Sequence, residues 1–148
     1  MKRLPKPGFV FVCGKENPHN IDATWHERED GAIITEIVFT LAQEGLASHT
    51  HDGALAALLG EAMGAVVWRA GFNVALVNLT IDYHQPLPLE KPVSVEAHLA
   101  DREGRAICTR GEIRLADGTA AVTGRGIYLE EPPSAHSAVR CSGSLRTR

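Results

Sequence analysis

The chain has 148 residues, 44% hydrophobic and 22% charged, a composition typical of one globular domain. Its 15 lysines and arginines are outnumbered by 18 aspartates and glutamates, giving a formal net charge of −3 at pH 7. A chain without a basic excess or a polybasic run is not expected to bind nucleic acid. The sequence also lacks any run of about 18 apolar residues, so we expect no membrane span.

Cysteine usage and the N-terminus bear on the cellular compartment. Cys13, Cys108 and Cys141 are odd in number and widely spaced, which predicts neither a disulfide framework nor a structural metal site. The basic N-terminus is followed only by the short apolar run 9–12, below the roughly 7–15 residues of a signal-peptide core. We therefore expect a reduced, cytoplasmic setting.

Residues 1–22 hold three of the eight prolines together with Gly8 and Gly14, and we expect an extended lead-in there. Asp30-Gly31 then separates two segments, 23–29 and 32–40, that can alternate as strands, and this dipeptide is typical of a hairpin turn. Both faces of the second segment are largely apolar, which predicts burial on two sides.

The apolar pattern then changes to a helical period, with a predicted helix at about 52–70. The segment is rich in alanine and leucine, begins after Asp52 as the expected N-cap, and ends at Gly71. Because the helix is apolar on almost every side, it must be enclosed on almost every side.

Four strand-like segments separated by turn residues follow the helix, at 74–84, 92–100, 106–115 and 119–129. This order predicts an α+β domain over 23–130, in which a curled antiparallel sheet of about six strands wraps one long central helix. Residues 131–148 are poor in apolar side chains and are expected to be disordered. Exposed sheet edges favour pairing with a second copy, so we expect a dimer.

The most informative segment for chemistry runs from His51 into the helix. A helix N-terminus offers free backbone N–H groups and a positive dipole end that can hold a developing oxyanion. Glu61 is the only ionisable side chain between Gly53 and Trp68, which makes it a candidate general base or nucleophile. Alternatively, Glu61 pairs with a basic group across a subunit contact or reaches solvent at the helix edge.

The segment His51-Asp52-Gly53, leading into Leu58-Leu59-Gly60-Glu61-Ala62-Met63-Gly64, resembles the motif of the hotdog-fold acyl-CoA thioesterases of the phenylacetate-pathway branch. The resemblance covers roughly residues 9–130. It includes Cys13-Gly14 with Asn17-Pro18, Glu44-Gly45, Leu79-Thr80-Ile81-Asp82-Tyr83 with Pro86 and Pro88, Glu103-Gly104-Arg105, and Asp117-Gly118-Thr119.

This resemblance implies a hotdog fold and hydrolysis of an aryl or aliphatic acyl-CoA thioester in a site at a dimer interface. It further implies a homodimer, or a dimer of dimers, that needs no cofactor besides the coenzyme A thioester of its substrate. The backbone N–H groups of Asp52 and Gly53 would hold the oxyanion, and His51 would shape the loop.

The sequence departs from the family pattern at the positions that carry polar side chains. The family's catalytic carboxylate falls on Gly60, and two further polar positions fall on Gly45 and Leu76. Either Glu61 replaces the missing base, or Asp52 does so beside His49 and His51, or Asp52 only caps the helix. An Asp–His arrangement can activate water at neutral pH. If neither replaces it, the protein binds an acyl-CoA or a related ligand without cutting it.

Other signals are weaker. Gly60 leaves room for a ligand, and Arg105, together with Arg102, is a candidate for the phosphates of coenzyme A, although a solvated turn explains both arginines more simply. His49, His51 and Asp52 are competent metal ligands, but no third histidine motif accompanies them, so we predict no metal site.

Overall fold

The computed structural model describes residues 1–6, 8 and 10–131. The tail predicted from residue 131 onwards lies, apart from Glu131, outside the described residues. The elements in chain order are β1 (Lys2–Arg3), β2 (His26–Glu27), β3 (Ile33–Val38), the 3₁₀ turn η1 (Leu41–Gln43), α1 (Asp52–Arg69), β4 (Val74–Tyr83), β5 (Pro92–Glu103), β6 (Ala106–Arg114) and β7 (Ala120–Glu130).

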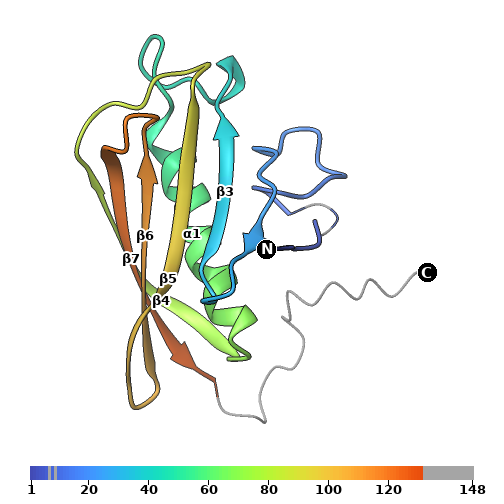
Figure 1. Cartoon of the computed structure of the whole chain (residues 1–148), viewed down its shortest axis with the longest axis vertical. Coiled ribbons are helices and arrows are strands. Elements are labelled where there is room, and N and C mark those ends of the chain that lie inside the picture. The colour runs from blue at the N-terminus through green and yellow to red at the C-terminus, as the bar shows by residue number, and fades with distance from the viewer. Residues whose placement is uncertain (7, 9, 132–148) are drawn as a thin grey trace.

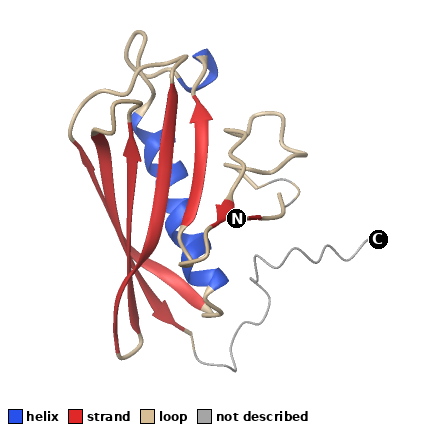
Figure 2. Ribbon diagram, in the orientation of Figure 1, coloured by secondary structure: helices blue, strands red, loops and turns tan. Residues whose placement is uncertain are grey.

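The strands form one antiparallel sheet in the order β1-β2-β3-β5-β6-β7-β4, and this sheet curls around α1 (Figures 1 and 2). The predicted α+β architecture is therefore confirmed. The sheet has seven strands rather than about six, because the lead-in contributes β1. β4 lies at the edge opposite β1, so a long strand is open on one side. No helix of the described residues has both the length and the apolar content needed to cross a membrane.

The hairpin predicted at Asp30-Gly31 is present. Gly31 adopts a φ of +85°, the left-handed region that glycine enters without a Cβ penalty, and the Arg28 N–H donates to the Ala32 carbonyl at 2.9 Å. Its first strand is only two residues long, although the sequence predicted one over 23–29. Two-sided burial of β3 was also wrong, since Glu36 and Val38 are exposed on the outer face.

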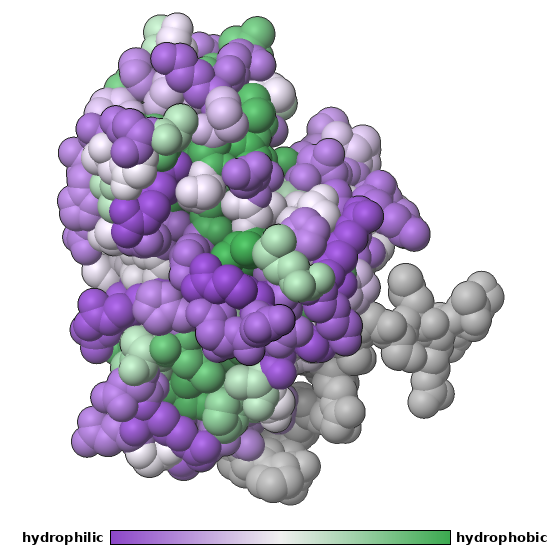
Figure 3. Space-filling view, viewed as in Figure 1, coloured by the Kyte–Doolittle hydropathy of each residue, from purple (hydrophilic) through white to green (hydrophobic). Residues whose placement is uncertain are grey.

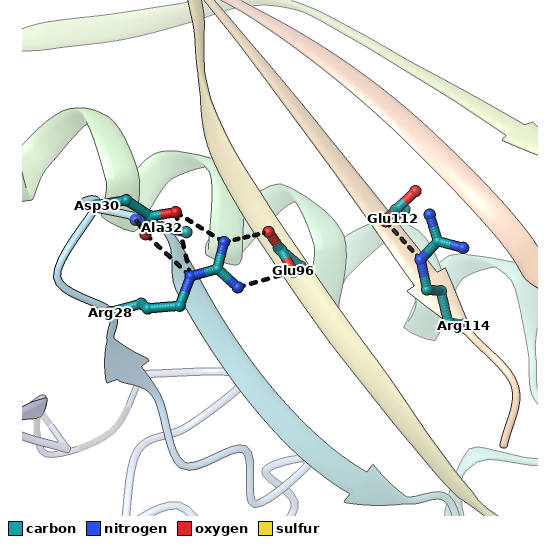
Figure 4. Close-up of polar contacts among 6 residues, drawn as sticks. All are labelled: Arg28, Asp30, Ala32, Glu96, Glu112 and Arg114. Carbon is teal, nitrogen blue, oxygen red and sulfur yellow. Dashed lines mark hydrogen bonds and ion pairs between the residues drawn. The ribbon is translucent and has the colours of Figure 1, made fainter. Parts of the chain in front are cut away.

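On the side of the molecule seen in Figure 3, hydrophilic residues predominate and apolar areas lie between them. Arg28 bridges Asp30 and Glu96, with nitrogen–oxygen distances of 2.8 and 2.7 Å, and Arg114 pairs with Glu112 at 2.6 Å (Figure 4). These surface pairs contribute little stability individually. They indicate that the sheet buries only its concave face, against the helix.

α1 approaches the sheet closely over a row of small residues. Gly111 of β6 pairs in register with Gly124 of β7 and with Ala97 of β5, all on the helix side. A Cβ atom added at Gly111 or at Gly124 would lie 2.8 Å from a methyl carbon of Leu59. The fully buried Leu59 side chain therefore fills the space that two side chains would need, and this contact fixes how deep the helix sits.

The lead-in packs beside β3 and closes the other side of the helix (Figure 1). Leu4, Val12, Cys13, Ile21 and Trp25 are buried, and they belong to the same core cluster as the helix residues. The Leu4 N–H donates to the Trp25 carbonyl at 2.8 Å, which ties the start of the chain to β2. The enclosure predicted for an apolar helix is thus supplied by the sheet and the lead-in together.

Gly111→Ala is expected to lower the free energy of unfolding by about 1–3 kcal/mol, because the new methyl group overpacks Leu59. Urea unfolding followed by circular dichroism measures the change. Arg110→Ala, at the neighbouring exposed position, is the matched control and should shift stability by less than about 0.5 kcal/mol. Equal stability of Gly111→Ala and wild type would show that the close approach is not required.

Candidate functional site

A pocket of about 610 Å³ opens at the N-terminus of α1. Its walls are the loop residues 44–46 and 49–52, Leu55 on the first turn of the helix, and the segment 83–87 that leaves β4. The predicted residues His51 and Asp52 therefore line one cavity. His49, which the sequence placed beside Asp52 as a candidate part of the base, also lines it. Glu44, Tyr83, His84 and Gln85 line it too, and the sequence did not assign these four to a site.

His51, rather than Asp52, is the N-cap of α1. Its ring Nδ1 accepts the Gly53 N–H at 2.9 Å, while Asp52 is the first helical residue. The Asp52 carboxylate still lies in the first turn, where a negative charge interacts favourably with the positive end of the helix dipole. The predicted cap was therefore one residue late. An imidazole nitrogen with a lone pair can accept a backbone N–H of the first turn, as a carboxylate does. Histidine is not among the residues that usually signal a helix N-cap.

This capping bond leaves one N–H group free at the helix N-terminus. Gly53 donates to His51, and the N–H groups of Ala54 and Leu55 donate to the His51 carbonyl at 3.0 and 3.2 Å. The Asp52 N–H has no hydrogen-bond partner among the described residues. Of the two N–H groups predicted to hold an oxyanion, only that of Asp52 is unengaged.

Capping also fixes the tautomer of His51. An N–H group can only donate, so Nδ1 must present its lone pair, and the neutral ring then carries its proton on Nε2. The second ring nitrogen of this pocket-lining histidine is consequently a donor.

Gly45 explains one departure from the family pattern. A Cβ atom there would lie 2.7 Å from the Cα atom of His51, a distance that real Cβ atoms essentially never show. The loop folds directly over His51, and the Gly45 N–H donates to the His49 carbonyl at 2.9 Å. A polar side chain at position 45 is incompatible with this loop.

Tyr83 lines the pocket from the end of β4, and the sequence named it within a segment that resembles the family. Its hydroxyl donates to the Asp52 carbonyl at 2.8 Å. Burial, and then the nearby charge of Asp52, raise the pKa of Tyr83, so its hydroxyl remains a donor at neutral pH. The sequence signal was available, because Tyr83 ends a strand just before the Pro86-Leu87-Pro88 turn.

Glu61 lies away from this pocket. Its Oε1 accepts the Trp25 indole N–H at 3.0 Å, on the side of α1 that the lead-in covers. Burial, followed by a hydrogen bond to Glu61, raises the pKa of the Cys13 thiol to about 12. The partners of Glu61 are therefore neutral donors within one chain, and a catalytic role for it stays a prediction.

Gly60 lies about 100° around the helix from Glu61 and faces β4. A Cβ atom at Gly60 would lie 3.4 Å from Leu79 Cδ2, and the residue is half-buried. The two neighbouring positions thus point at different parts of the fold, and the structure does not bring the Glu61 carboxylate to the place of Gly60.

Arg105 lies in the β5–β6 hairpin, at the opposite end of the sheet from the pocket (Figure 1). Its guanidinium donates to the Glu130 carbonyl, with distances of 3.2 Å from Nε and 2.5 Å from a terminal nitrogen. Arg102 pairs with the Glu130 carboxylate at 2.8 Å and stacks over Phe72. Within one chain both arginines serve the hairpin, and a role toward coenzyme A stays a prediction.

Among the residues that the structure describes, no three histidine, cysteine, aspartate or glutamate side chains are grouped so that they could hold a metal ion. One residue of the pocket wall has a buried polar atom without a partner. The hydroxyl of Thr50, a residue only 4% exposed, has no hydrogen-bond partner in the described chain.

Comparison with known proteins matches a segment that contains most of the residues lining this pocket. The model of the thioesterase superfamily matches residues 47–122. Acyl-coenzyme A thioesterase THEM4 of Xenopus laevis is 36% identical over 75 residues, covering 50% of this chain and 33% of that protein. THEM4 of Rattus norvegicus is 28% identical over 95 residues, covering 64% and 41%. The chain thus spans between a third and two fifths of these relatives.

Solved structures match over most of the chain. A crystal structure of a thioesterase superfamily protein is 30% identical with a TM-score of 0.79, covering 81% of this chain and 62% of its own. A mutant of the phenylacetic acid degradation protein PaaI from Thermus thermophilus has a TM-score of 0.67 at 18% identity, covering 74% and 93%. A hypothetical thioesterase from Streptococcus pneumoniae, solved with coenzyme A, has 0.68 at 14%, covering 74% and 85%.

Glu61→Ala is expected to lower the free energy of unfolding by about 1–3 kcal/mol, because it strands the Trp25 indole N–H. Glu61→Gln keeps an oxygen acceptor at that position and should lose clearly less. Urea titration of both variants measures the difference. Equal losses of stability in the two variants would mean that the negative charge of Glu61, rather than its hydrogen bond with Trp25, stabilises this region.

Proposed function

The chain belongs to the thioesterase superfamily and has its hotdog fold, and from this premise we propose that it hydrolyses the thioester bond of an acyl-coenzyme A. One observation carries the proposal. Asp52, whose N–H is unengaged within the described chain, and His51, whose Nε2 is a donor, both line the pocket at the positive end of α1. Two such donors can bind the oxyanion that forms when water attacks a thioester carbonyl.

The reaction needs few parts beyond these donors. Water adds to the carbonyl carbon, the negative charge develops on the oxygen held by Asp52 and His51, and the carbon–sulfur bond then breaks to release a thiol and a carboxylic acid. A general base must take the proton from water. Glu61 and Asp52 are the two carboxylates that the sequence offers, and of these only Asp52 shares the pocket.

Coenzyme A as the carrier is supported by the relatives. The THEM4 proteins are acyl-coenzyme A thioesterases by name, and the Streptococcus pneumoniae neighbour was solved with coenzyme A. The acyl group is proposed to be aryl or aliphatic. We propose that the acyl group lies beside Gly60, because this glycine leaves the helix face next to Leu79 without a side chain.

The site is proposed to be completed by a second copy of the chain along β4. This edge strand exposes Leu76, Val77 and Leu79 at 49%, 54% and 37%, and its outer edge is unpaired within one chain. An exposed apolar edge is a liability that pairing with another copy removes. Because Leu79 lies against Gly60, such pairing would bring partner residues to the same helix face. A dimer of dimers would extend this arrangement.

A binding protein without catalysis is the second candidate. The observation in its favour is Gly60, which stands where the family carries its catalytic carboxylate. This candidate predicts tight association with acyl-coenzyme A and no release of free thiol.

Asp52→Pro is expected to lower kcat about 10²–10³-fold, because it removes one oxyanion donor. Proline is tolerated at the first helical position, and His51 already has the extended conformation, with φ −62° and ψ 132°, that a following proline requires. Detection of free thiol released from a panel of acyl-coenzyme A thioesters measures kcat.

Asp52→Asn is the matched control, because it keeps the N–H group and removes only the charge. It is expected to lose far less activity than Asp52→Pro. Equal losses in the two variants would assign the effect to the carboxylate, and no thiol release by the wild-type protein would leave the binding function.

Replacing Leu76 and Val77 together by aspartate is expected to convert a dimer into a monomer and to abolish thiol release, because two charges enter an apolar interface. Analytical ultracentrifugation measures the mass. Leu41→Asp, at an exposed apolar position outside β4, is the control. A wild-type protein that sediments as a monomer would contradict the proposed interface.

A further inference from the structure

We propose that His49 is the general base that activates water in this pocket. The proposal rests on the hydrolytic function above and deepens it, because it supplies the group that Gly60 no longer provides. His49 is half-buried and lines the pocket together with His51 and Asp52. Its role follows from the direction of one hydrogen bond.

The ring of His49 is held in the tautomer that a general base requires. Its Nδ1 lies 2.9 Å from the Ala47 carbonyl oxygen. A carbonyl oxygen can only accept, so Nδ1 carries the proton and the neutral ring presents a lone pair on Nε2. A histidine oriented through Nδ1–H in this way has its second nitrogen available to take a proton.

The two histidines of the loop therefore complement each other. His51 caps the helix through the lone pair on its Nδ1, so its Nε2 donates. His49 donates the proton on its Nδ1 to Ala47, so its Nε2 accepts. Hydrolysis needs both functions, an acceptor for the proton of water and a donor for the carbonyl oxygen. Thr50, which lies between them in sequence, also lines the pocket, and its buried hydroxyl lacks a partner in the described chain.

The loop holds His49 rigidly. Its backbone N–H donates to the Leu46 carbonyl and its carbonyl accepts the Gly45 N–H, both at 2.9 Å. The preceding residue, Ser48, has a φ of +66°, an unfavourable conformation for a residue with a Cβ. The Glu44 carboxylate accepts the Ser48 N–H at 2.8 Å and helps to maintain it. Such strain persists only where the surrounding contacts determine the conformation.

The proton balance of the step is complete. His49 Nε2 takes a proton from water while the water oxygen bonds to the carbonyl carbon, and the resulting oxyanion is held by the Asp52 N–H and His51 Nε2–H. The tetrahedral species then collapses, the carbon–sulfur bond breaks, and the imidazolium of His49 gives its proton to the departing sulfur. The products are a carboxylic acid and a free thiol, and His49 returns to its neutral form.

The test compares two variants of His49 in the free-thiol assay. His49→Asn keeps a side-chain N–H at the position of Nδ1, so it can preserve the bond to Ala47 while removing the base. His49→Ala leaves space for free imidazole. We expect kcat to fall about 10²–10⁴-fold in both variants with little change in KM. Added imidazole should partly restore His49→Ala.

The controls separate this inference from the proposed function. His98→Ala, on the exposed outer face of β5, should keep wild-type kcat, and imidazole should not restore Asp52→Pro. Imidazole without protein gives the uncatalysed background. Wild-type kcat in His49→Asn, or loss of activity without imidazole rescue in His49→Ala, would overturn His49 as the base. Loss of turnover in Asp52→Asn or Glu61→Gln with His49→Asn active would assign the base to that carboxylate. No turnover by wild type would instead overturn the proposed function.

Discussion

The depth at which α1 sits on the sheet governs the rest of this structure. Gly111 and Gly124 let the Leu59 side chain reach the strands, and any larger residue at either position would push the helix outward. Because the position of the helix is fixed there, the helix begins directly after the loop that carries His49 and His51. The pocket is therefore a consequence of packing near the middle of the helix, as well as of the residues that line it.

The helix presents two different faces to its surroundings, and this division separates structure from chemistry. The face at Glu61 meets Trp25 and the buried Cys13 of the lead-in. The face at Gly60 meets Leu79 of β4, the strand with the exposed apolar edge. The first face carries a carboxylate that accepts a hydrogen bond from Trp25, and the second carries none at Gly60.

Periodicity and turn chemistry predicted most of the regular structure, because both are local. The helix expected at about 52–70 is α1, and the strands expected from residue 74 onward match β4 to β7, except that β5 continues to Glu103. The resemblance at His51 to Gly64 located the pocket. β1 was missed, since it exists only through pairing with β2, which lies far along the chain. β2 was predicted over 23–29 and is two residues long.

Sequence alone determined the fold class, which follows from apolar period and turn residues, and the family, which follows from the resemblance of its motifs. The tertiary structure decided which groups point into the pocket. The tautomers of His49 and His51, the single free N–H at Asp52 and the position of Tyr83 all depend on hydrogen bonds set by the exact path of the backbone. No residue type reveals that path, because one imidazole can donate or accept according to the atom placed beside it.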